Sequence, residues 1–157
     1  MKGFQFKIDG DWAHFKKPET NNNPLSHDLI PKTALVGMIG AVLGIEREKM
    51  KSLFPLLSED LLYGVELLKP VKKTSCGFTS HTAINPTAIK SPKAFEMLRD
   101  VSYKVCVGLY SERSQSIFDD FQNAILEGYA VYNPYLGIAN CPAELTFISQ
   151  GEFTMMG

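Results

Sequence analysis

Residues 14–33 hold the densest group of side chains in this sequence that could bind a ligand. The group combines the rings of His14 and Phe15 with the cations of Lys16 and Lys17. Recognition of single-stranded RNA uses such a mixture, because rings stack on bases, cations contact phosphates, and amides and hydroxyls bind base edges and 2′-hydroxyls. An ordinary surface loop with Phe15 in the core is the alternative interpretation. The remaining members are short polar side chains and the first residues of an apolar stretch: Thr20, Asn21, Asn22, Ser26, His27, Lys32 and Thr33.

The charge of the chain is unevenly distributed. The 157 residues carry a net charge of −1, which argues against a protein that simply coats nucleic acid. Residues 67–104 contain seven basic and two acidic side chains, whereas residues 105–157 contain one basic and six acidic side chains. The basic middle, which includes Lys72, Lys73 and Lys90, is where a polyanion would find phosphate contacts. A solvated loop with ordinary lysines would give the same pattern.

Catalytic and metal-binding motifs are missing from the sequence. Neither a GxSxG nucleophile elbow nor a GxxxxGK[ST] phosphate loop occurs. The cysteines lie far apart and the histidines show no zinc spacing, which argues against a disulfide framework or a metal site. RNA cleavage by His14, His27 or His81 is conceivable, although nothing in their spacing supports it. The sequence therefore predicts no catalytic residue, no metal and no cofactor.

The apolar runs indicate where the protein works. No run reaches the roughly 18 residues that a membrane span needs. Residues 1–7 alternate between apolar and polar side chains and lack the apolar core of a signal peptide. We therefore expect a cytoplasmic protein.

Apolar periodicity predicts the elements that must position these residues. The expected strands are residues 4–8, 61–68, 103–107 and 143–149, and the expected helices are residues 31–44, 46–57 and 112–128. We expect the second helix to break before Pro55, because proline cannot donate within a helix. Residues 69–93 are rich in Lys, Ser, Thr and Pro, and we expect them to form a long excursion between two strands, shaped as a protruding hairpin.

Three glycines interrupt the first predicted helix, at Gly37, Gly40 and Gly44. Gly44 suits the C-terminal end of the helix. A glycine inside a helix costs about 1 kcal/mol relative to alanine. Close packing against a sheet, or the close approach of a ligand, would explain them, and close packing is the simpler explanation.

The order strand, helix, strand, strand, helix, strand predicts an α+β fold. It is the ferredoxin-like (RRM-like) βαββαβ arrangement, with an antiparallel sheet and both main helices on one face. We expect a single domain over residues 1–157, with residues 69–93 as an insertion. The open face of such a sheet is a common platform for single-stranded RNA.

Several segments together resemble a known protein family. Residues 10–18, 24–27 and 31–44 are similar to the N-terminal signature of CRISPR-associated (Cas) protein family five. This family supplies a RAMP-type subunit to type I effector complexes (Cascade), and the hydrophobic style resembles the type I-B branch. Residues 98–105, and then 131–137 with 141–143, are similar to later parts of the family in the same order.

The resemblance implies an RRM-like domain with a thumb hairpin that grips the 5′ handle of CRISPR RNA. Such subunits sit between the repeated backbone subunit and the large subunit, and we expect this chain to be a non-catalytic one. His14, Phe15, Lys16, Lys17 and the helix entrance at 32–33 would line the handle site. Residues 69–93 would be the thumb, whose lysines meet RNA phosphates or the neighbouring subunit: Lys72, Lys73 and Lys90.

The sequence also departs from the family pattern. His27 stands where a tyrosine is common, and Ile30 stands where a proline is usual. Family members continue past the fourth strand, so contact with the large subunit is in doubt. Three functions stay open: an RNA-binding subunit, a truncated decoy that acts as a viral anti-CRISPR mimic and blocks recruitment of the large subunit, and a repeat-RNA endonuclease. One branch of the family does cleave precursor RNA, but no match to its catalytic set occurs here.

Overall fold

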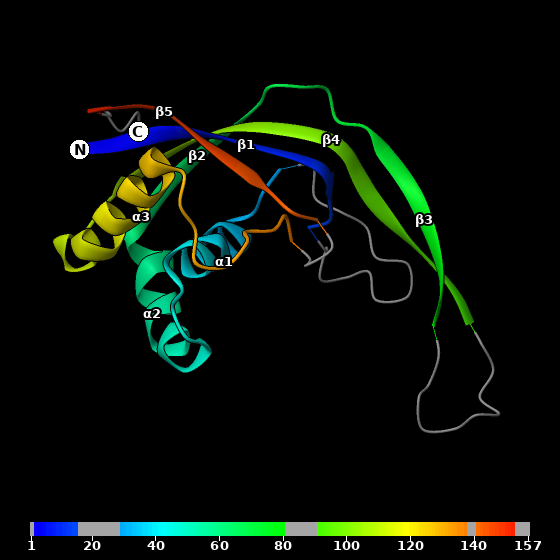
Figure 1. Cartoon of the computed structure of the whole chain (residues 1–157), viewed down its shortest axis with the longest axis horizontal. Helices are drawn as coiled ribbons and strands as arrows, with labels where there is room; N and C mark the ends of the chain where they lie inside the picture. Colours follow the sequence, from blue (N-terminus) through cyan, green and yellow to red (C-terminus); the bar gives the residue numbers. More distant parts are fainter. Residues whose placement is uncertain (1, 16–28, 81–90, 138–140, 153–157) are drawn as a thin grey trace.

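An antiparallel sheet with all three helices on one face forms the body of the protein (Figure 1). This computed structural model describes residues 2–15, 29–80, 91–137 and 141–152. The elements in chain order are β1 (Lys2–Ala13), α1 (Lys32–Leu43), α2 (Arg47–Asp60), β2 (Leu61–Leu67), β3 (Lys73–Ser80), β4 (Ser91–Leu109), a 3₁₀ turn (Glu112–Ser114), α3 (Gln115–Glu127) and β5 (Glu144–Glu152).

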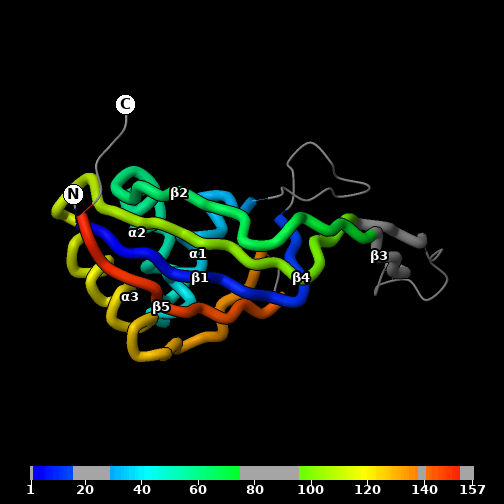
Figure 2. Tube along the Cα trace, turned by 90° about the horizontal axis from the view of Figure 1, so that it is seen from above, coloured from blue at the N-terminus to red at the C-terminus, as the bar shows by residue number. Residues whose placement is uncertain are grey.

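Strand β1 lies in the middle of the sheet. The strand order is β2-β4-β1-β5, and β3 pairs with the first half of β4, so β2 and β3 follow each other along one edge of β4 (Figure 2). All the pairings are antiparallel. This order confirms the predicted ferredoxin-like βαββαβ arrangement, with β2 and β3 sharing the place of its second strand.

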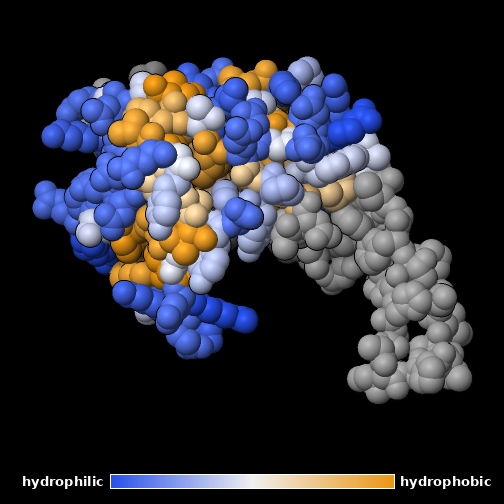
Figure 3. Space-filling model, viewed as in Figure 1, coloured by the Kyte–Doolittle hydropathy of each residue, from blue (hydrophilic) through white to orange (hydrophobic). Residues whose placement is uncertain are grey.

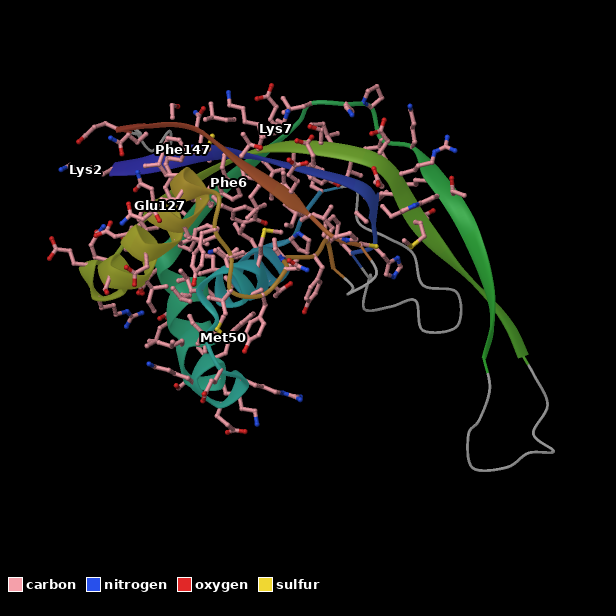
Figure 4. All side chains as sticks on the ribbon, in the orientation of Figure 1. Lys2, Phe6, Lys7, Met50, Glu127 and Phe147 are labelled. Carbon is pink, nitrogen blue, oxygen red and sulfur yellow. The ribbon has the colours of Figure 1, made fainter. Side chains whose placement is uncertain are left out.

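The two faces of the sheet differ in polarity because side chains alternate along a strand. Phe4, Phe6 and Ile8 of β1 are fully buried against the helices. Lys7 lies on the opposite face, where it pairs with Asp9 at 3.3 Å (Figure 4). The alternation at residues 4–8 therefore predicts this strand correctly.

The helices bury different fractions of their surface. Helix α1 buries six residues around its circumference, as its continuous apolar sequence predicts. Helix α3 buries only one side, formed by Phe118, Phe121, Ala124 and Ile125. In Figure 3 hydrophilic residues cover the outward end of α2, while apolar residues reach the surface near α1.

The predicted break before Pro55 is wrong, because α2 continues from Arg47 to Asp60. The last turn stays helical because it is anchored on both sides. Leu57 is buried in the core, and the Asp60 carboxylate accepts hydrogen bonds from Arg113 Nε at 2.8 and 3.0 Å and from Ser114 Oγ at 2.6 Å. The hydrogen-bonded Arg113 guanidinium lowers the pKa of Asp60, and burial opposes this shift.

Strand β4 is much longer than the predicted residues 103–107. Its first half pairs with β3, from Ser80 opposite Ser91 to Lys73 opposite Leu98, and its second half pairs with β1 and β2. The β3–β4 hairpin, which we call the arm, curves away from the body past the helices (Figure 1). The expected hairpin is present, but its paired strands run over residues 73–80 and 91–98, and residues 81–90 lie outside the described part of the chain. Asp100, at the junction of arm and body, has a left-handed φ of 52°.

Candidate functional site

A cavity of about 310 Å³ opens where the end of β1 meets α1, α2 and the segment that follows α3. Its described walls are mostly apolar and include no Lys, Arg, Asp or Glu. The side chains and backbone that line it include those of His14, Phe15, Thr33, Gly37, Met38, Phe54 and Tyr135.

Backbone hydrogen bonds hold the segment after α3 against this cavity. The N–H groups of Val131 and Tyr132 donate to the carbonyls of Val42 and Ala41 at the C-terminal end of α1, at 2.9 and 3.0 Å. The Ala41 carbonyl also accepts from the Gly44 N–H at 3.2 Å, so helix cap and following segment together satisfy the end of α1. The chain then turns, and Tyr135 reaches the cavity with 45% of its surface exposed.

His14 is fixed from two directions. Its ring Nδ1 lies 2.6 Å from the carbonyl oxygen of Glu96 in β4, so Nδ1 carries the proton and donates it. Its backbone N–H donates to the carbonyl of Leu136 at 3.1 Å. Gly137 follows with φ of 91°, and a Cβ there would collide with the His14 carbonyl. Only glycine therefore fits this turn.

The structure buries both rings that the sequence offered for stacking. Phe15 is 2% exposed and its ring centroid lies 6.3 Å from that of Tyr103, while His14 is 5% exposed. Phe15 therefore lies in the core, as the alternative interpretation of this segment expects, and the ring of His14 is buried beside it. A role in RNA binding stays a prediction, and any contact with them must be made through the cavity that they line.

The two residues at the start of α1 differ in accessibility: Lys32 is hydrogen-bonded to the protein, and Thr33 is exposed. The Lys32 ammonium donates to the carbonyl of Ser58 near the end of α2 at 2.7 Å, so it joins α1 to α2. Thr33 is exposed and lines the cavity in the first turn of α1. Thr33 is therefore the residue of this pair that a ligand reaches directly.

The lysines at the base of the arm are not part of the cavity lining. Lys72 is exposed, and Lys73 forms an ion pair with the Glu96 carboxylate at 3.6 Å. Glu96 thus links the two predicted groups, because its carbonyl holds His14 and its carboxylate pairs with the arm. The other predicted residues lie outside the described part of the chain: Lys16, Lys17, Thr20, Asn21, Asn22, Ser26, His27 and Lys90.

Among the cavity residues that sequence reasoning missed are Gly37, Met38, Phe54 and Tyr135. Gly37 and Tyr135 each had a signal, as an unexplained glycine and as part of the family-like segment 131–137. Met38 and Phe54 had none, because an apolar residue at helical spacing looks the same whether it faces a core or a cavity.

Within the described residues, no three His, Cys, Asp or Glu side chains gather closely enough to bind a metal ion. None of the helices in these ranges has the length and apolarity needed to cross a bilayer.

Comparison with known families decides the relationship of this chain. The family model described as CRISPR-associated protein (Cas_Cas5) matches residues 3–152. The chain belongs to the Cas5 family. This finding confirms the resemblance seen in the sequence, although none of the curated proteins matches the chain.

Solved structures share the Cas5 fold. A chain of a "CRISPR RNA-guided surveillance complex" is 18% identical with a TM-score of 0.65, and the match covers 88% of this chain and 58% of that one. A chain of a Type III-B Cmr-beta complex bound to cognate target RNA is 12% identical with a TM-score of 0.63, covering 98% and 66%. A crystal structure of a CRISPR-associated protein is 15% identical with a TM-score of 0.55, covering 95% and 69%. The RAMP-type fold predicted from the sequence is confirmed, and this Cas5 chain spans about three fifths of the first of these chains.

Proposed function

We propose that this Cas5 chain is a non-catalytic subunit of a type I (Cascade) complex that grips the 5′ handle of CRISPR RNA. It would contact the backbone subunit and, in an intact complex, the large subunit. Family membership and the similar fold in a CRISPR RNA-guided surveillance complex support this proposal. The single observation that carries it is the connection, through Glu96, of a mostly apolar cavity to the lysines at the base of the arm.

The arm and the cavity suit different parts of a single RNA strand. Exposed lysines on the arm suit phosphates, and an apolar cavity suits bases. In this proposal residues 69–93 act as the thumb, and Lys90 adds a phosphate contact to those of Lys72 and Lys73. Lys16, Lys17, Thr20, Asn21, Asn22, Ser26 and His27 would add contacts beside the cavity.

A tagged copy expressed in cells that carry a complete type I system tests the whole proposal. We expect CRISPR RNA, the backbone subunit and the large subunit to copurify with it. RNA and backbone subunit without the large subunit would favour the decoy. Cleavage of repeat RNA by the purified protein alone would favour the endonuclease, and recovery of no RNA would contradict the proposal.

Neutralising the arm tests where phosphates bind. Lys72→Ala with Lys73→Ala should lower RNA affinity and reduce the slope of log K against log salt by about 1.4, since each phosphate contact on a single strand contributes about 0.7. Folding stability should change little because both lysines are exposed. Fluorescence anisotropy across a salt series measures both quantities.

Lys49→Ala with Lys51→Ala is the matched control, because it removes the same charge from the exposed side of α2. If this control loses as much affinity and slope as the arm variant, the arm has no special role.

A further inference from the structure

The three glycines of α1 serve different purposes. A Cβ on Gly40 would lie 3.0 Å from the Met50 sulfur, so this glycine lets α2 pack closely (Figure 4). Gly44 ends the helix with a left-handed φ of 68°, and a Cβ there would lie 2.6 Å from Val131 Cγ1. Gly37 is exposed and a Cβ there would meet no atom within 4 Å. Packing therefore explains Gly40 and Gly44 but not Gly37.

Gly37 lies on the wall of the cavity described above. Glycine in a helix interior is unfavourable, and at this position no neighbour within the described protein needs its small size. A glycine without a packing role that faces a cavity indicates that something else approaches the backbone there. The bare helix surface at Gly37 gives a flat ligand room that any side chain would occupy.

From this juxtaposition we propose that the cavity over Gly37 takes one unstacked nucleobase of the bound RNA. The inference rests on the proposed function and specifies the ligand at that site. The base would lie against the α1 backbone at Gly37, with Met38, Phe54 and Tyr135 around it.

The chemistry of the walls favours a base over a phosphate. A phosphate needs cations or clustered donors, whereas the described lining residues include no lysine or arginine, and the Lys32 ammonium is bound to Ser58. A base has flat apolar faces and a polar edge. Here the rings of Phe54 and Tyr135 offer apolar surface, and the exposed Thr33 offers a hydroxyl on the same cavity.

The size of the cavity supports a single base. A volume of about 310 Å³ is at the lower end of the range for small-molecule sites, so it suits one ring system. The fixed orientation of His14 through the Glu96 carbonyl keeps the polar side of the cavity in place relative to the arm.

Filling the cavity from Gly37 tests the inference. Gly37→Leu adds a side chain into open space, and Gly64→Leu on β2 is the matched control, because Gly64 is also exposed with no atom within 4 Å of its Cβ and lies outside the cavity. The probe is a short fluorescein-labelled RNA with the 5′ sequence of the RNA that copurifies with the wild type. A series of variants of this RNA is measured beside it, and each variant lacks the base at one position.

We expect one missing base to weaken wild-type binding at least about tenfold, as loss of base–ring contacts does elsewhere. Gly37→Leu should bind every RNA of the set at that weakened level, and Gly64→Leu should behave as the wild type. Thermal unfolding should show no lower midpoint for Gly37→Leu. Tyr135→Ala, which truncates a wall, should also weaken binding and reduce the effect of that base.

If Gly37→Leu and Tyr135→Ala bind RNA as tightly as the wild type, and with the same dependence on single bases, the base pocket is overturned. The proposed function would then still stand. Failure of the wild type to bind RNA would overturn both.

Discussion

The two ends of the helical layer use the same residue types with opposite results. At the α3 end, Phe4 packs against Phe118 with ring centroids 5.2 Å apart, and Phe6 meets Phe121 edge-on at 5.6 Å. At the α1–α2 end, Phe54 and Tyr135 surround open space instead of each other. The rings at the first end fill the space between them. The rings at the second end leave a cavity, although their size and apolarity would allow them to fill it. Apolar composition alone therefore does not distinguish a region that stabilises from one that binds.

The largest expected effect compares one ring from each end. Phe121→Ala should destabilise the protein by about 3–5 kcal/mol, because this ring is fully buried. Phe54→Ala should cost less than about 1.5 kcal/mol, because this half-buried ring already borders open space. Urea unfolding measures both, and equal losses would remove the distinction between the two ends.

A smaller loss of stability is expected from Asp60, which joins the end of α2 to the 3₁₀ turn through hydrogen bonds. Asp60→Asn should lower stability by about 1–2 kcal/mol at pH 7, a reduced figure because the partner Arg113 is half exposed to solvent. The Arg113 guanidinium lowers the pKa of Asp60, so the carboxylate stabilises the fold above its unfolded pKa. This contribution should be lost as the pH falls below about 3.9 through the folded value.

Urea unfolding at pH 7 and at successively lower pH separates the wild type from Asp60→Asn. The wild type should lose stability faster with acid than the variant does. An identical acid dependence in the two proteins would show that Asp60 is not the titrating group.

The smallest effect sharpens the comparison within α1 itself. Gly37→Ala should stabilise the protein by up to about 1 kcal/mol, since alanine favours the helix and meets no neighbour. Gly40→Ala should gain less or destabilise, because its Cβ would approach Met50 at 3.0 Å. Thermal unfolding of the pair checks this order, and a loss of stability in Gly37→Ala would contradict it.

Much of the fold follows from local patterns. Alternation at Phe4, Phe6 and Ile8 predicts the central strand, and apolar spacing predicts α1 and α3. The predicted helix break before Pro55 was wrong because Leu57 and Asp60 are anchored by residues far along the chain. The early part of β4 lacks apolar alternation, since it pairs with β3 in the arm and not within the body.

The candidate site was less predictable than the fold. Thr33 and His14 do line one cavity, but Lys32 looked like a phosphate ligand and instead donates to Ser58. That contact depends on how α1 crosses α2, which local sequence does not specify. Cavities are properties of packed elements, so the walls formed by Met38 and Phe54 emerge only in three dimensions.

The central position of β1 has a consequence for synthesis on the ribosome. Ala13 pairs with Leu98 and Gly3 with Gly108, while β5 supplies the other neighbour from Glu144 onward. Strand β1 is translated before both of its partners and must therefore wait, with both edges unpaired, until β4 and β5 have been made. Such non-local pairing slows folding and exposes an aggregation-prone edge in the nascent chain. We therefore expect this protein to be most prone to aggregation during translation, when chaperones can bind the unpaired strand.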